Sequence, residues 1–174
     1  MRAADLAKLA ELASTEPPMT KVSLQGLSNA REIRRQLGAE LEKHIRGKES
    51  LDEFVARLRK VSDFQASRAR AIAQTEKTRA ANGGRYAKAI REYLDAHEKA
   101  KRQHKKRPET PLFQWVHTPA AKEPRRHHVN ISGMVRAIGE YFLPNVRYPG
   151  DPDAPPSETI HCHCYIRRYT RRAA

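Results

Sequence analysis

The sequence predicts an α+β fold, in which an N-terminal helical arm is followed by a small C-terminal domain that contains β-strands. Apolar residues recur every three or four positions across 27–100, which is the period of helices that pack along one side. Pro108 and Pro111 then end helical structure, and short apolar runs alternate with Pro-rich turns. We therefore expect three parts: an N-terminal helix and linker over 1–26, a helical region over 27–107, and a C-terminal domain with a basic tail over 108–174.

The helical region carries clear start and stop signals. Its first predicted helix ends at Gly47. Ser50 should begin the next helix, because Glu53 three residues later completes a capping box. A second box, formed by Ser62 with Gln65, predicts the start of a third helix.

The third helix contains the tripeptide Asn82-Gly83-Gly84. Adjacent glycines after an asparagine usually punctuate a helix, so we expect the helix to end or kink there. Beyond this point the helical period resumes and leads into a basic run over 99–107.

Composition limits the function of the chain. Its 174 residues hold 34 Lys and Arg against 20 Asp and Glu, a formal net charge of +14. Such a balance predicts a polyanionic partner: nucleic acid first, then an acidic protein surface or an anionic membrane. An aromatic content of 6% is thin for a large core, so a small domain here is expected to need a staple such as a metal. We expect no membrane-spanning segment and synthesis in a reducing cytoplasm.

The C-terminal domain is expected to hold three strands, over 113–118, 134–140 and 160–166. The third contains both cysteines of the chain, Cys162 and Cys164. If this segment is a strand, the two cysteines share one face, and His161 and His163 share the other. A tight turn through the cysteines would remove that separation.

Two cysteines at this spacing can both reach one cation. Zinc prefers four tetrahedral ligands from cysteine sulfur and histidine nitrogen, so two more ligands are needed. Three histidines elsewhere in the domain can supply them: His117, His127 and His128. The alternative is a metal-free domain in which the cysteines are small buried side chains.

The order of these features resembles the phage Mu F-like head morphogenesis proteins, the minor head proteins of tailed bacteriophages. The features in the C-terminal half are, in order, Trp115-Val116-His117-Thr118, Pro124-Arg125, His128 with Gly133, Tyr148-Pro149-Gly150-Asp151-Pro152, and Cys162-x-Cys164. In the helical region, Ile72-Ala73-Gln74-Thr75-Glu76 followed by Arg79, Ala80, Asn82 and Gly84 resembles the Thr-Glu helix that precedes this half of the family. The resemblance covers roughly residues 51–166.

The resemblance implies a minor capsid component of the virion, made in the cytoplasm of a bacterial host. Its partners would be the phage portal or major capsid protein, or the packaged DNA, and its role would be head assembly or genome delivery rather than catalysis. Arg125, His128, Cys162 and Cys164 match the Arg, the His and the paired cysteines of the family. For the fourth zinc ligand, His117 is our first choice and His161 the second.

Two departures from the family pattern accompany the match. Residues 118–121 stand where family members often have an acidic residue, and His163 stands where they often have Arg between the cysteines. His163 is therefore either a further ligand or a simple replacement, and the sequence leaves both open.

Two basic segments, 99–107 and 167–172, predict contact with double-stranded DNA that does not depend on the DNA sequence. Such contact comes from neutralisation of the phosphates. They contribute Lys99, Lys101, Arg102, Lys105, Lys106, Arg107, Arg167, Arg168, Arg171 and Arg172. The alternatives are a solvated helix end with a solvated tail, or docking to an acidic portal subunit.

Two other functions compete with that of a head protein. The sequence His127-His128-Val129-Asn130 resembles the histidine–asparagine cores of small nucleases, which predicts a metal-dependent nuclease acting on DNA. The other is a basic, DNA-binding assembly factor without a metal.

Overall fold

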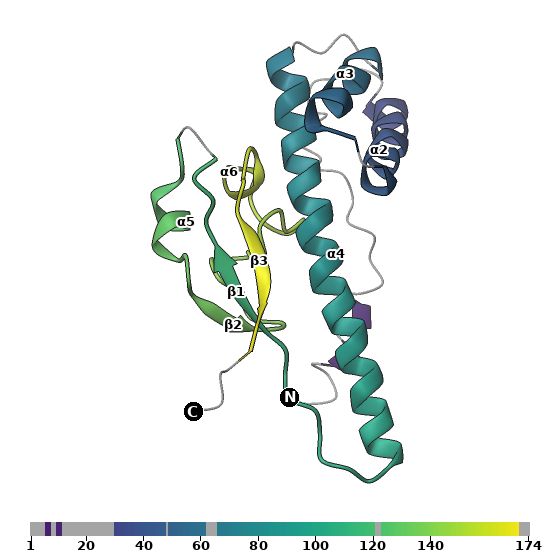
Figure 1. Ribbon diagram of the computed structural model, residues 1–174, viewed down its shortest axis with the longest axis vertical. Coiled ribbons are helices and arrows are strands. Elements are labelled where there is room, and N and C mark those ends of the chain that lie inside the picture. The colour runs from purple at the N-terminus through teal and green to yellow at the C-terminus, as the bar shows by residue number, and fades with distance from the viewer. Residues whose placement is uncertain are drawn as a thin grey trace.

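The computed structural model describes residues 6–7, 10–11, 30–47, 49–61, 66–120 and 123–170. Three helices precede the sheet within the described part of 30–102: α2 (Ala30–Arg46), α3 (Leu51–Val61) and the long α4 (Ala66–Arg102). A small three-stranded sheet with two short helices follows. Figure 1 shows α2 and α3 beside the first turns of α4 and the sheet beside its middle. The predicted α+β class is confirmed.

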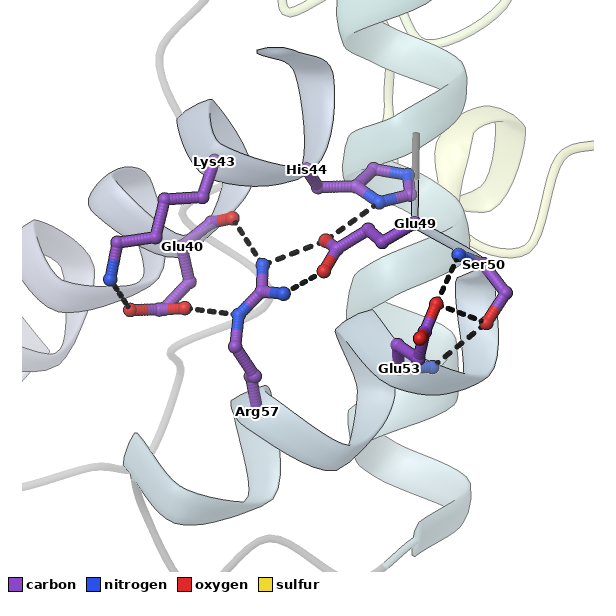
Figure 2. Close-up of polar contacts among 7 residues, drawn as sticks. All are labelled: Glu40, Lys43, His44, Glu49, Ser50, Glu53 and Arg57. Carbon is purple, nitrogen blue, oxygen red and sulfur yellow. Dashed lines mark hydrogen bonds and ion pairs between the residues drawn. The ribbon is translucent and has the colours of Figure 1, made fainter. Parts of the chain in front are cut away.

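Two predicted helix boundaries, the end before Gly47 and the start at Ser50, are confirmed by the structure. Helix α2 ends at Arg46, directly before Gly47. The hydroxyl of Ser50 accepts the backbone N–H of Glu53 at 3.2 Å, and the Glu53 carboxylate accepts the backbone N–H of Ser50 at 2.6 Å, as Figure 2 shows. This is the predicted capping box. The Ser62–Gln65 box and the linker lie outside the described residues.

A polar network joins α2 to α3. The guanidinium of Arg57 on α3 donates to the carboxylates of Glu40 and Glu49 and, at 3.1 Å, to the backbone oxygen of Glu40, which places it between the two segments (Figure 2). His44 stacks on Phe54 with ring centroids 4.6 Å apart. Beneath this network, α2, α3 and the start of α4 share one apolar core, made of Leu37, Phe54, Val55, Leu58, Ala69, Ile72 and Ala73.

Helix α4 runs for 37 residues without a break. Of the two outcomes predicted for Asn82-Gly83-Gly84, an end or a kink of the helix, the end is therefore wrong. Asn82 is 1% exposed, and its side chain hydrogen-bonds to the backbone of Cys164 and Ile166 instead of forming a turn. The second half of the helix also buries Tyr86, Ile90 and Tyr93 in the C-terminal core. Packing along the whole helix therefore outweighs the local preference of two glycines.

The sheet is antiparallel, with strand order β2-β1-β3. Strand β1 (Leu112–Val116) pairs with β2 (Val135–Ala137) on one side and with β3 (Tyr165–Tyr169) on the other. Phe113, Trp115 and Ile166 face the core that α4 completes. The first two strands fall close to their predicted ranges.

The third strand begins later than predicted. Pro156 starts the short helix α6 (Pro156–Thr159), and the chain then turns at His161, where φ is +55°. Strand β3 begins only at Tyr165, so both cysteines lie in a turn that precedes it. The expectation that strand alternation separates the cysteines from His161 and His163 is therefore wrong.

The turn Tyr148-Pro149-Gly150-Asp151-Pro152 is packed against α4. Gly150 has φ +81°, and a Cβ there would lie 2.7 Å from the Cα of Arg79. Asp151 is fully buried, and its carboxylate accepts two hydrogen bonds of 2.8 Å from the Arg147 guanidinium. This turn fixes the C-terminal unit to the middle of the long helix.

Candidate metal centre

Three buried side chains from separate segments meet in one cluster. His128 comes from the short helix α5 (Arg126–Asn130), and Cys162 and Cys164 come from the turn before β3. The Nδ1 atom of His128 lies 3.6 Å from Cys162 Sγ and 3.8 Å from Cys164 Sγ. The donor atoms of all three residues lie within 4.8 Å of one another. The cluster could therefore bind a metal ion.

His117 approaches the same cluster from the end of β1. Its Nδ1 lies 3.7 Å from Cys164 Sγ. The structure thus brings three of the four residues favoured by the sequence, His128, Cys162 and Cys164, within mutual reach of one ion. The fourth, His117, lies next to Cys164 but outside that group of mutually close donors. A hollow of about 20 Å³ lies among them, which is room for a single ion or water.

The other histidines considered from sequence are placed differently. His161 is exposed and His163 is half-buried, and both line the hollow. The backbone oxygen of His163 accepts a hydrogen bond of 2.8 Å from the Thr118 hydroxyl. His127 is 49% exposed and bonds to Glu158.

The two thiols behave as a coupled pair. A hydrogen bond from Cys164, together with the nearby His128, outweighs burial and lowers the pKa of Cys162 to about 5. The same hydrogen bond and burial raise the pKa of Cys164. Without a cation, the pair therefore favours one thiolate that accepts from the other thiol. A bound cation would stabilise both thiolates, because metal ligation requires deprotonated sulfur.

Trp115 brings a buried N–H donor close to the cluster. Its indole ring is fully buried and lies edge-on to His128, with centroids 5.1 Å apart. Its Nε1–H has no hydrogen-bond partner among the described residues, yet it favours the ionised form of Cys164. A buried donor of this kind suits a site that holds thiolates, so the surroundings of the cluster fit a metal.

Polar side chains of α4 hydrogen-bond to the backbone of the turn that carries the two cysteines. Thr78 Oγ1 donates to the Cys162 carbonyl at 2.7 Å, and Asn82 Nδ2 donates to the Cys164 carbonyl at 3.3 Å. Thr75 Oγ1 accepts the backbone N–H of His161 at 3.1 Å. On the opposite side, Arg125 donates to the Ile160 carbonyl at 2.6 Å.

Sequence reasoning missed this role of α4. A signal for it was present, because Gln74, Thr78 and Asn82 are polar residues spaced four apart on one face of an otherwise packed helix. All three are buried, with exposures of 9%, 6% and 1%. Buried polar side chains at helical spacing indicate a partner with free backbone groups.

The described residues among those predicted to contact DNA lie mostly toward one end of the molecule. Lys99, Lys101 and Arg102 lie on the last turns of α4, and 105–107 follow them. Arg168 on β3 lies 4.0 Å from Glu92, seven residues before Lys99 and so about 10 Å away along the helix axis. Figure 1 shows the ends of α4 and β3 pointing the same way. Arg171 and Arg172 lie outside the described residues.

Across the part of the chain that the structure describes, no helix is both long and apolar enough to cross a membrane.

The chain was compared with protein-family models, with curated proteins and with solved structures, and none of the three comparisons found a match.

Proposed function

We propose that this chain is a head morphogenesis protein of a tailed phage, a minor capsid component whose C-terminal domain is closed by zinc. The observation that carries the proposal is the contact of His128 with Cys162 and Cys164, which joins helix α5 to the turn before β3. The resemblance to the Mu F-like proteins identified these three residues from sequence. The turn around Gly150 and the Thr-Glu stretch of α4, two other parts of that resemblance, both take part in holding the same unit together.

Zinc is the metal that suits these donors best. Sulfur at about 2.3 Å and nitrogen at about 2.05 Å from a tetrahedral ion lie roughly 3.6 Å apart. The three sulfur–nitrogen distances to His128 and His117 are 3.6, 3.8 and 3.7 Å. Two thiolates and two imidazoles complete four coordination positions, which is typical of a structural site and leaves none for a substrate. Such an ion would supply folding free energy, which supports a role in assembly rather than catalysis.

The second part of the proposal is contact with packaged DNA near the portal. Cations at the ends of α4 and β3 support it, since non-specific binding depends on phosphate neutralisation. If about six phosphates were contacted, the affinity would fall with salt at a log–log slope of roughly −5. Docking of this surface to an acidic face of a portal subunit is the alternative partner.

Elemental analysis of protein purified without a polyhistidine tag tests the metal, and we expect one zinc per chain. Salt-dependent binding to duplex DNA of mixed sequence tests the basic surface. Changing Lys101, Arg102, Lys105 and Lys106 to Gln should flatten the slope, whereas the matched set Arg59, Lys60, Lys77 and Lys88, also basic, should leave it unchanged. An equal effect of both sets would exclude a specific DNA surface.

The role in head assembly needs a test in the phage. Deleting the coding sequence from the phage or prophage that carries it should give defective heads, and mass spectrometry of purified virions should detect the chain in wild-type particles. Normal particles that lack the chain would reject the proposal.

A metal-dependent nuclease is the second candidate, favoured by one observation. The exposed His127 bonds to Glu158 at 2.7 Å beside the cluster, an arrangement that could accept a proton from water. Plasmid nicking in the presence of Mg²⁺ or Zn²⁺ separates the two functions. We expect no nicking with either ion.

A further inference from the structure

Glu158 lies behind the metal cluster, on the side of the His128 ring that faces away from the cysteines. Its Oε2 is 2.7 Å from the Nε2 atom of His128. The other ring nitrogen, Nδ1, is 3.6 Å from Cys162 Sγ. His128 is 2% exposed, so the ring has a carboxylate at one nitrogen and thiols at the other, with almost no access to water.

The partner of one ring nitrogen decides what the other can do. A neutral imidazole carries one N–H, and an ionised carboxylate can only accept a hydrogen bond. Glu158 therefore holds the proton on Nε2. The lone pair of Nδ1 is then directed at the sulfurs, which is the form in which histidine binds a metal.

His127 fixes the carboxylate in this position. Its Nε2 lies 2.7 Å from the same Oε2 atom, and its ring stands edge-on to that of His128, with centroids 4.8 Å apart. Two imidazoles thus share one carboxylate oxygen. A carboxylate oxygen has room for both hydrogen bonds, because it carries two lone pairs.

The geometry points to Glu158 as a positioning residue that holds His128 in the tautomer whose Nδ1 binds the metal. Glu158 acts through His128 and is not itself a ligand. This inference rests on the proposed metal site and adds to it a fifth residue, on α6, that sets the affinity of the site.

Metal competition against a chromogenic chelator measures the effect. We expect Glu158→Ala to weaken zinc binding by about 10–100-fold, the usual effect of losing such a partner. Glu158→Gln retains an oxygen that accepts the Nε2–H, so its loss should be smaller, below about 10-fold. Glu109→Gln is the matched control, because it removes the same charge at an exposed position that does not line the hollow, and we expect its affinity to match wild type.

Nitrogen-15 NMR of the His128 ring provides a readout that a merely structural role would not move. In zinc-loaded wild-type protein the Nε2–H proton should resonate far downfield, as expected for a proton shared with a carboxylate at 2.7 Å, and in Glu158→Gln it should move upfield. A wild-type Nε2–H without such a downfield shift would overturn the inference, even if Glu158→Ala does not fold.

The outcomes separate the two proposals. Protein that takes up zinc with the ring proton on Nδ1, or whose affinity is unchanged in Glu158→Ala, overturns the role of Glu158 and leaves the metal site standing. Wild-type protein that takes up no zinc overturns both.

Discussion

His128 Nδ1 lies 3.6 Å from Cys162 Sγ, although 34 residues separate the two in the chain. The contact joins helix α5 to the turn before β3, two segments that are not paired with each other in the sheet. It lies against the fully buried Trp115 at the centre of the C-terminal core. A cation at this point would therefore tie two segments of the chain together beside the apolar core.

Removing a cysteine should abolish the metal and selectively open the C-terminal unit. We expect Cys162→Ser and Cys164→Ser each to lose zinc, because serine is a poor ligand for this ion. Amide hydrogen exchange should then show loss of protection in 112–169, while α2, α3 and the first half of α4 keep theirs, since these have their own core. A metal-free variant with an unchanged melting curve would contradict a structural metal.

A second pair of variants identifies the fourth ligand. His117 Nδ1 lies 3.7 Å from Cys164 Sγ, whereas His161 is exposed at the rim of the hollow. His117→Ala should weaken zinc affinity by at least about 100-fold, in line with the loss of one of four ligands. His161→Ala should change it by less than about twofold. The reverse order, measured by the same chelator competition, would make His161 the ligand.

Asn82→Ala should destabilise the protein by about 2–4 kcal/mol, because it leaves two buried backbone groups without partners. These groups are the Cys164 carbonyl and the Ile166 N–H, which bond to the two ends of the Asn82 amide at 3.3 and 3.0 Å. Asn130→Ala, at an exposed position, is the control and should cost less than about 0.5 kcal/mol. Urea denaturation followed by circular dichroism measures both.

Replacing either of two glycines by alanine should change the stability of the protein in opposite directions. Gly150→Ala adds a Cβ 2.7 Å from the Arg79 Cα at a φ of +81°, so we expect a loss of about 3 kcal/mol or more. Gly84 lies inside α4, where an added Cβ would meet nothing within 4 Å among the described residues beyond its own stretch of helix. Gly84→Ala should therefore add about 0.5–1 kcal/mol. Thermal unfolding of the two variants tests the close approach of the turn to the helix.

His44 should make the helical unit sensitive to mild acid. Burial, followed by the charges of Lys77 and Arg57, lowers the pKa of His44 below the ordinary 6.5. His44 Nδ1 also lies 3.0 Å from a Glu49 carboxylate oxygen, but this carboxylate is already paired with Arg57 and does not reverse the shift. The unfolded chain then binds the proton more readily than the folded one, so stability is complete above pH 6.5 and is lost as the pH falls toward the folded pKa.

Amide exchange in α2 and α3 at a pH about one unit above and one unit below the ordinary histidine pKa measures this loss. The variant His44→Gln keeps a hydrogen-bond donor but cannot titrate, so its protection should vary less with pH. His97→Gln is the control. Equal pH dependence in wild type and His44→Gln would show that another group is responsible.

Local signals in the sequence predicted local structure well. The Ser50–Glu53 box needs only residues three apart, and it is present as expected. Asn82-Gly83-Gly84 misled because its effect is decided by partners 82 and 84 residues away, at Cys164 and Ile166. The third strand was placed too early because the turn at His161 depends on contacts with Thr75 and Arg125 rather than on a glycine.

The candidate site was predictable only in part. Cysteine and histidine are scarce and chemically distinctive, so His117, His128, Cys162 and Cys164 could be named from sequence. The contact of Glu158 with His128 could not be predicted, because nothing local links a carboxylate to a histidine 30 residues away until the fold brings them to 2.7 Å.

Asn82 has one more consequence, for how copies of the chain meet. Strand β3 is at the border of the sheet, and the outward backbone groups of such a strand attract strands from other molecules. The Ile166 N–H and the Cys164 carbonyl are already taken by one side chain of α4. A neighbouring copy therefore finds no free backbone at these two groups, and the long helix blocks strand addition at the start of β3.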